Sequence, residues 1–538
     1  MKQTIKCLIA AFAAMLMSVA AFAQVTTSAL GGRVVDANGE PIVGAAVVAT
    51  HEPSGTVYGV ITNADGRYAI NGMRAGGPYK VEMSCLGYQT LAYTDVTLQL
   101  AETSALNGQL AEDSQMLGEA MVIAASASKF SAQKMGSATN ISSADIISVP
   151  TVSRSISDVT RLSPYGGNGM SFAGADGRTA NFTVDGANFN NNFGLSSSLP
   201  GGGNPISIDA IEEMQVVISP YDVRQTNFIG GGVNAITKSG TNTLKGSAYV
   251  YHRNENMRGN MAAGQEVAGA RDKDRNTTYG FTLGGPIVKD KLFFFVNAEY
   301  STIPTVVNRW RGSVDGKANA DAYISRTTLE DLQKVSDYVM REYGYDTGSW
   351  TDYPATESNM KLLARLDWNI NDNHKFNVRY SQTMNKYSSS PSSSVNPINP
   401  NPYNRNTYGR TSKYAQFFES SRYFQEQNFM SLAAELNSRF GNNASNVLRV
   451  TWSHQNEPRS FVGDLFRVFL AGHDVDGDLV HAGDDVVVGQ DVAILADDDT
   501  GTGTGGDIIA EPVVAGGHVL GGDGHHGAFH LGGDLCGG

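Results

Sequence analysis

The alternation of apolar and polar side chains in the second half of the chain is the feature that most constrains its fold. From Leu362 to Ile370 every second residue is apolar, and the pattern resumes at Phe376 after the turn-forming stretch Asn371-Asp372-Asn373. Successive side chains of a strand point to opposite faces, so these segments predict antiparallel hairpins with one apolar face. The same pattern predicts two further hairpins, at residues 279–300, across Gly284-Gly285-Pro286, and at residues 430–452, across Gly441-Asn442-Asn443.

The apolar face of these hairpins can lie against a protein core or against lipid. A soluble sandwich with one wet face would show a similar pattern. Aromatic residues near the expected strand ends favour lipid, because aromatic girdles mark both interfaces of a membrane barrel; they are Phe293-Phe294-Phe295, Trp310 and Trp452. Backbone groups in lipid must be satisfied internally, so hairpins of this kind would have to close into a barrel.

The first residues of the chain resemble an export signal. Lys2 and Lys6 precede an apolar run from Cys7 to Val19, and the small residues Ala21 and Ala23 then mark a cleavage site before Gln24. The run is shorter than the roughly 20 residues that span a bilayer. Residues 1–23 therefore predict a cleaved signal peptide.

Residues 24–110 are predicted to form a compact β-sandwich. Short β-type runs are separated by the turns Asp36-Ala37-Asn38-Gly39 and Asn63-Ala64-Asp65-Gly66. The stretches Gly32 to Asp36, Gly39 to Ala45 and Thr62 to Tyr68 resemble a carboxypeptidase regulatory-like domain. The resemblance implies a prealbumin-like or carbohydrate-binding-like sandwich without peptidase residues, and by analogy a module that could bind glycan.

Residues 111–127 contain a short acidic and then aliphatic segment. Its sequence runs through Glu119, Ala120, Met121, Val122 and Ile123. The segment resembles the TonB box of TonB-dependent receptors. A free extended segment can add as a strand to an exposed sheet edge, which suits that role, although an ordinary linker strand would have the same pattern.

Residues 128–242 carry motifs in the order expected of a receptor plug. In the first motif a strand runs into the Val184-Asp185-Gly186 turn. In the second, a helical turn with Asp209, Ile211 and Glu212 is predicted to lead into another strand, and the side chains of Glu212 and Glu213 are expected to be exposed. The last motif comprises Gly230, Gly231, Gly232, Asn234, Thr237 and Lys238. These motifs resemble the plug of the Oar-like branch of TonB-dependent receptors. A Gly-Pro-x-Ser-x-x-Tyr-Gly stretch of commoner members does not occur here, which favours larger ligands such as peptides or glycans over iron siderophores.

Residues 243–466 are expected to supply about seven strands of an outer-membrane barrel, where transporters of this type need about 22. Long polar loops are expected at residues 311–360 and 385–412. Residues 467–538 lack Lys, Ser, Asn, Tyr, Trp and Met and hold nearly all of the net charge of −13. Such restricted usage predicts a disordered, out-of-frame tail after a frameshift near Phe466.

The sequence thus predicts a mainly β chain: a sandwich, an α/β plug and an incomplete antiparallel transmembrane barrel. The predicted function is TonB-dependent import across the outer membrane, with a peptide, a glycan or a metal chelate such as a siderophore as ligand. Expected partners are the TonB periplasmic domain, outer-membrane lipid and the barrel-assembly machinery; no catalytic group, metal, cofactor or nucleic-acid surface is expected. The alternative is an exported carbohydrate-binding, peptide-binding or adhesion module without transport activity.

Overall fold

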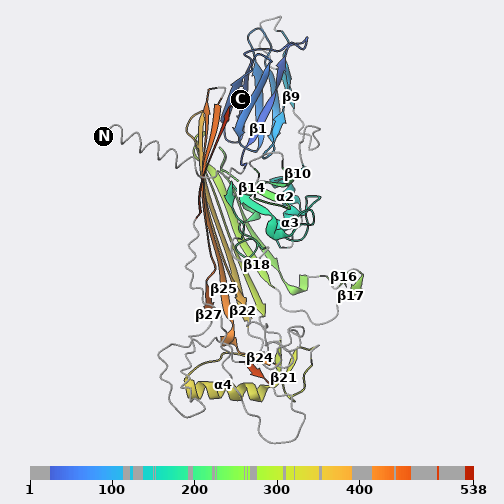
Figure 1. Cartoon of the computed structure of the whole chain (residues 1–538), viewed down its shortest axis with the longest axis vertical. Helices are drawn as coiled ribbons and strands as arrows, with labels where there is room; N and C mark the ends of the chain where they lie inside the picture. The colour runs from blue at the N-terminus through green and yellow to red at the C-terminus, as the bar shows by residue number, and fades with distance from the viewer. Residues whose placement is uncertain are drawn as a thin grey trace, which may run out of the picture.

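Three bodies are arranged along a wall of long strands in the computed structural model (Figure 1). The sandwich lies at one end of the wall, the plug lies beside the wall, and a small module with helix α4 lies at the other end. The structure describes residues 25–112, 121–124, 137–149, 151, 153–191, 198–220, 225, 227–257, 259, 261–262, 264–266, 275–306, 310–319, 322–350, 354–389, 415–441, 444–461, 493–495 and 528–537. The predicted signal peptide, with Ala21 and Ala23, lies outside these residues.

The sandwich consists of two sheets around an apolar core. One sheet contains β4, β1 and β7, with β8 also paired to β1, and the other has the order β3-β2-β5-β6-β9. Both predicted turns are confirmed: the Asp36 carboxylate accepts from the N–H groups of Asn38 and Glu40, and the Asn63 amide oxygen accepts from those of Asp65 and Arg67. The strand bounds are β1 Ser28–Val35, β2 Ala46–His51, β3 Thr56–Ile61, β4 Arg67–Met73, β5 Gly76–Ser84, β6 Leu91–Leu98, β7 Thr103–Ala105, β8 Gly108–Gln109 and β9 Met121–Ala124.

The plug is a five-stranded sheet of order β10-β13-β14-β11-β12 with short helices. A 3₁₀ turn, η2, feeds strand β13 as the sequence predicted, but the expected exposure of Glu213 is wrong: only 6% of this residue is exposed. Inside a strand the side-chain period is two, so Glu213 points to the face opposite that of Glu212. The bounds are β10 Ser137–Ser142, α2 Ser143–Ser148, α3 Ile156–Thr160, η1 Gly177–Thr179, β11 Asn181–Val184, β12 Ala187–Asn188, η2 Ile208–Ala210, β13 Ile211–Ser219 and β14 Gly232–Thr237.

The wall is an antiparallel sheet with seven long strands, and six of them correspond to the three predicted hairpins. Along β22, Leu362, Leu366 and Trp368 are exposed, whereas Leu363 and Asp367 between them are buried, so the predicted alternation is confirmed. Hairpin β18–β19 differs from the prediction, because β18 runs through the Gly284-Gly285-Pro286 stretch with a register shift after Pro286 and turns only after Val288. The long strands are β15 Lys245–Arg253, β18 Asn276–Val288, β19 Leu292–Val306, β22 Pro354–Asn369, β23 His374–Ser389, β25 Tyr423–Phe440 and β26 Ala444–Asn456.

The buried face of the wall receives the plug. Phe295, Leu363 and Phe429 of the wall belong to the same apolar core as the plug residues. The rings of Phe189 in the plug and Phe429 in β25 are 4.8 Å apart, centroid to centroid. The lumen side of the wall therefore buries the plug, and the opposite side leaves its large apolar side chains uncovered.

The far end of the wall carries a folded module where a polar loop was expected at residues 311–360. Helix α4 Leu329–Tyr343 begins at Thr328, whose hydroxyl accepts from the N–H of Asp331, and ends at Gly344 in the left-handed conformation. Its Leu332, Val335 and Val339 pack on Phe418, because they recur at helical spacing on one face. The remaining short elements are η3 Glu255–Met257, β16 Met261–Ala262, β17 Gln265–Glu266, β20 Arg311–Ser313, β21 Ile324–Thr328, β24 Ala415–Phe417, η5 Glu419–Ser421 and β27 Arg459–Phe461.

Two strands occur in the region where a disordered tail was predicted. Strand β28 Ala493–Leu495 pairs with β24, and β29 Ala528–Gly537 pairs with β26. The prediction of disorder does not hold for these two segments. The open edge of β26 offers unpaired N–H and C=O groups, and β29 pairs with them as an extended strand. The rest of residues 467–538 lies outside the described part of the chain.

Candidate functional site

The plug carboxylate of Asp185 is the centre of a buried junction. Asp185 has φ of 47° at a tight turn and is followed by Gly186 with φ of 76°. Its Oδ1 accepts from the Thr237 N–H at 2.9 Å and its Oδ2 from the Thr237 hydroxyl at 2.7 Å. Parallel pairing of β11 with β14 brings the two motifs together, since Val184 lies opposite Ala235. Two plug motifs that are far apart in sequence therefore meet at one carboxylate.

Two arginines of the barrel wall hold this carboxylate. Arg365 Nη1 is 3.2 Å from Asp185 Oδ1, and Arg379 Nε is 3.0 Å from Asp185 Oδ2. Only 1% of the Arg379 side chain is exposed, and its two Nη atoms donate to Ser381, Ser431 and the Val184 carbonyl. We call Asp185, Thr237, Arg365 and Arg379 the Asp185 junction. It joins the plug to the lumen side of the wall through largely buried, charge-assisted hydrogen bonds and ion pairs.

The same charges continue to the sandwich. Asp367 pairs with Arg365 at 2.8 Å and with Arg74 of the sandwich at 3.1 Å. A second ion pair of the wall joins Arg449 to Glu435 at 2.6 Å, and the hydroxyl of Thr26 in the sandwich donates a hydrogen bond to Glu435 Oε2. The chain of ion pairs from Asp185 through Arg365 and Asp367 to Arg74 thus connects plug, wall and sandwich, and the Arg449–Glu435 pair adds a second contact between wall and sandwich.

A second cluster joins the plug to the wall around Glu299. Lys361 of the neighbouring wall strand is 2.8 Å from Glu299 Oε1, and the Ser207 and Tyr249 hydroxyls donate to Glu299 Oε2. Arg154 of the plug pairs with Asp209 and stays 3.8 Å from Glu299. We call Glu299, Lys361, Ser207, Tyr249 and Arg154 the Glu299 junction. Here the wall neutralises its own carboxylate, and the plug arginine adds a looser contact.

The sandwich is fastened to the plug at the backbone of Leu100. Its N–H donates to Glu213 Oε1 at 2.9 Å, and its carbonyl accepts from Asn140 Nδ2 at 3.1 Å and Gln215 Nε2 at 2.9 Å. Burial raises the pKa of Glu213 to about 7, opposed by the Leu100 N–H, and the nearby Glu212 and Glu102 carboxylates raise it further. This seam therefore contains a carboxyl that titrates close to neutral pH.

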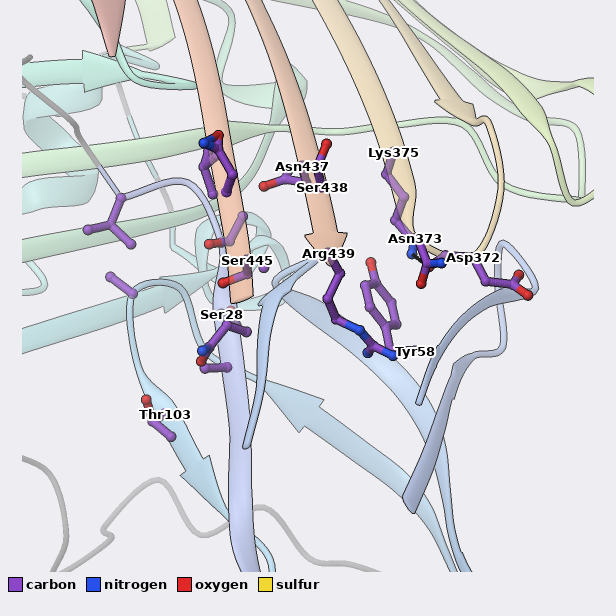
Figure 2. Close-up of a pocket in the computed structure, with 18 of the residues that line it drawn as sticks. Ser28, Tyr58, Thr103, Asp372, Asn373, Lys375, Asn437, Ser438, Arg439 and Ser445 are labelled. Carbon is purple, nitrogen blue, oxygen red and sulfur yellow. Dashed lines mark hydrogen bonds between the residues drawn. The ribbon is translucent and has the colours of Figure 1, made fainter. Parts of the chain in front are cut away.

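A cavity of about 450 Å³ lies between sandwich, plug and wall, lined among others by Arg74, Asp185 and Arg365. A smaller one of about 170 Å³ lies where wall turns meet the sandwich (Figure 2). There Lys375 and Arg439 extend from the wall towards the sandwich, and Lys375 Nζ is 4.2 Å from the centre of the Tyr58 ring. In the part of the chain that the structure describes, no three His, Cys, Asp or Glu side chains are grouped to hold a metal ion.

Close packing explains the glycines of the last plug motif. A Cβ at Gly230 would lie 2.4 Å from Ala175 Cβ, one at Gly231 would lie 2.8 Å from Phe172 Cβ, and one at Gly232 would lie 2.8 Å from the ring of Phe228. The remaining predicted plug residues are also part of the sheet: Asn234 accepts from the Thr183 hydroxyl, Ile211 is buried in the core, and the Lys238 N–H donates to the Ala210 carbonyl. Glu212 lines the larger cavity, and Asp209 pairs with Arg154.

Known protein families match two parts of the chain, the sandwich and the beginning of the wall. Residues 29–111 match the carboxypeptidase regulatory-like domain, and residues 236–314 match an outer membrane beta barrel domain. The TonB-dependent transporter Oar of Myxococcus xanthus is 26% identical over 407 residues, which cover 72% of this chain and 36% of the transporter. The chain is a homologue of this TonB-dependent transporter. Its place is the outer membrane, and it spans little more than a third of its relative's length.

Solved structures of receptors also resemble the chain. The outer membrane transporter YddB from Escherichia coli has a TM-score of 0.40 and 12% identity, over 60% of this chain and 39% of that one. The siderophore receptor PirA from Acinetobacter baumannii has a TM-score of 0.35 and 16% identity, over 59% of this chain and 40% of that one.

The segment predicted to be a TonB box does not lie with the plug motifs. Met121, Val122 and Ile123 belong to β9, which pairs in parallel with β6 of the sandwich (Figure 1). Glu119 and Ala120 lie outside the described residues. The plug motifs and the described part of the predicted TonB box are thus carried by different bodies of the molecule.

The wall residues of the two junctions were not predicted as site residues. Arg365 and Arg379 of the Asp185 junction, and Asp367 beside them, occupy polar positions of the strands whose alternation the sequence predicted. Charged residues spaced two apart on the lumen side of a barrel strand could have indicated these sites in the sequence. A charge at such a position needs a partner from the plug or from a neighbouring strand.

Proposed function

We propose that this protein acts as a TonB-dependent outer-membrane receptor that imports a ligand with energy delivered from the periplasmic side. The homology to a TonB-dependent transporter supports this function, as does the match to an outer membrane barrel domain. In this proposal the wall forms part of the pore, the plug closes it, and Glu119, Ala120, Met121, Val122 and Ile123 form the handle that TonB binds.

One observation carries the proposal: the plug is held to the lumen side of the wall through the Asp185 junction. A closure that must open needs a discrete attachment, and a buried carboxylate between two arginines is such an attachment. The plug's apolar core also continues into the wall through Phe295, Leu363 and Phe429. Sandwich, plug and wall therefore act as one closed unit at rest.

The finer parts of the proposal concern ligand and partners. The ligand is a peptide, a glycan or a metal chelate, and insertion into the outer membrane uses the barrel-assembly machinery. The protein is proposed to act without catalysis, metal or cofactor. The motif residues Val184, Asp185, Gly186, Gly230, Gly231, Gly232, Asn234, Thr237 and Lys238 are proposed to hold the plug together and to fasten it.

The test is binding of the purified TonB periplasmic domain to the full chain in detergent. Val122→Pro removes a backbone donor and fixes φ inside the handle, so it should abolish binding by strand addition. Ser126→Pro makes the same change four residues later and should leave binding unchanged. Equal binding by both variants and the parent chain would refute the handle.

Cell fractionation separates the proposal from a soluble binding module. A receptor should sediment with the outer membrane after high-salt washing, whereas a binding or adhesion module without a membrane wall should be recovered in the periplasmic extract. Recovery in that extract would favour the alternative function.

A further inference from the structure

The handle segment is already part of a sheet. Strand β9 Met121–Ala124 pairs in parallel with β6, with Leu91 opposite Met121 and Thr94 opposite Ala124. The sheet order β3-β2-β5-β6-β9 makes β9 its terminal strand. Within the described residues, no strand pairs with the other edge of β9.

The pairing with β6 solves a problem that a free handle would have. A lone strand of four residues has no stable extended conformation in water, and a partner that binds it must order it at an entropic cost. Strand β6 is itself fixed by β5 and by the sandwich core, in which Leu91, Val96 and Leu98 are buried. Docking on β6 therefore holds β9 extended before any partner arrives.

We propose that the sandwich is a platform that presents the handle. An extended strand of the TonB periplasmic domain pairs with the outer edge of β9 while β6 keeps the inner edge, so the sheet of the sandwich continues into the partner. The inference rests on the proposed function and adds to it the surface that the partner meets. It also gives the sandwich a role in energy coupling, since a pull on β9 is transmitted to β6 and from there to Leu100 at the plug seam.

The unpaired edge of β9 is suited to binding an extended strand of the partner, more so than a pocket formed by side chains. Unpaired N–H and C=O groups along a strand edge recognise another extended backbone, and main-chain hydrogen bonds supply affinity. The opposite arrangement is a latch, in which β6 competes with TonB and the handle must leave the sandwich to be bound. The two arrangements predict opposite effects of locking β9 onto β6.

The experiment is a reversible lock in the full chain. Ala92 and Val122 are opposite each other in register, so their Cα atoms lie about 5 Å apart, within reach of a disulfide. The double variant Ala92→Cys with Val122→Cys is made in a chain in which Cys7, Cys85 and Cys536 are changed to alanine. The control Thr94→Cys with Val122→Cys is two residues out of register, which puts the Cα atoms about 8 Å apart, too far for a disulfide.

The probe is the purified TonB periplasmic domain, and its affinity is measured for oxidised and reduced protein. The platform predicts that the in-register pair crosslinks, that the control does not, and that the locked chain binds within about twofold of the reduced chain. An affinity loss of about tenfold or more on oxidation, reversed by reductant, would establish the latch and overturn the platform. Equal crosslinking of both pairs would overturn the docked handle.

Failure of this inference is distinguishable from failure of the proposed function. When the reduced chain binds the probe and the locked chain does not, the handle stands and only the platform is lost. When the reduced chain and the parent chain both fail to bind, the proposed handle itself is lost.

Discussion

The Asp185 junction and the Glu299 junction both fasten the plug to the wall, but they differ in which of the two bodies supplies the anion and which the cation. In the Asp185 junction the plug supplies the carboxylate that pairs with Arg379, and among the described residues no other anion forms an ion pair with this arginine, whose side chain is 1% exposed. In the Glu299 junction the wall supplies both Glu299 and Lys361, each about 5% exposed, and the plug adds Arg154, which is 20% exposed. Neutralising the plug's charged side chain would leave a buried cation without its anion in the first case and a carboxylate still paired with Lys361 in the second.

This difference assigns the two junctions different parts in closure. A buried charge that loses its partner is far more costly than a half-exposed one, because water can reach and stabilise the latter. The Asp185 junction should therefore dominate the attachment of the plug, and the Glu299 junction should adjust its position.

The largest effect is expected for Asp185→Asn, which keeps the shape of the side chain and removes its charge. Arg379 then remains buried without its anion, and we expect the plug to lose about 3 to 5 kcal/mol of stability. Amide hydrogen exchange in β11 and β14 of the detergent-solubilised chain measures the loss. Unchanged protection in both strands would show that Asp185 does not fasten the plug.

The Glu213 seam is expected to respond to pH. The folded pKa of about 7 lies above the reference of 4.5, so the contact is fully stabilising below pH 4.5 and loses stability as pH rises to 7. The total change should be on the order of 3 kcal/mol. Exchange at Leu100 should slow on acidification relative to unstructured amides, and Glu213→Gln should remove this dependence while keeping the hydrogen bond to Leu100. Parallel pH profiles for both proteins would contradict the assignment.

A smaller effect is expected for Arg154→Gln in the Glu299 junction. Lys361 continues to neutralise Glu299, so the loss should be about 1 kcal/mol. The comparison with Asp185→Asn uses the same exchange measurement. A loss as large as that of Asp185→Asn would mean that the two junctions are equivalent.

No measurable change is expected for Asp176→Asn. Asp176 pairs with Arg178 at 2.7 Å on the plug surface, where both side chains are about half exposed. Water replaces such a pair at little cost. This variant is the matched control for Asp185→Asn, because the chemical change is identical but Asp176 is exposed and has a single arginine partner.

The sequence predicted those parts of the molecule that depend on local patterns. The sandwich turns at Asp36 and Asn63 follow from side-chain hydrogen bonds over two to four residues, and the wall hairpins follow from alternation along each strand. The resemblance also selected Asp185 and Thr237, which meet in the structure. Short-range chemistry was enough in each case.

The parts that were missed depend on contacts between distant segments. Arg365 is 180 residues from Asp185 along the chain, and no local pattern pairs them. Glu213 was expected to be exposed because an acidic pair after a helical turn is usually solvated, yet the seam with Leu100 buries it. The docking of β9 on the sandwich was also missed, since any strand edge offers the same backbone groups.

A double-mutant cycle between Asp185 and Arg379 tests the central claim most directly. Asp185→Asn and Arg379→Met are made singly and together, and the opening free energy of β11 and β14 is measured by hydrogen exchange. A buried pair that fastens the plug predicts that the double variant is clearly more stable than the sum of the two single losses would allow, because no charge is left stranded. Strictly additive losses would contradict the account, since they would mean that the plug carboxylate and the wall arginine do not depend on each other.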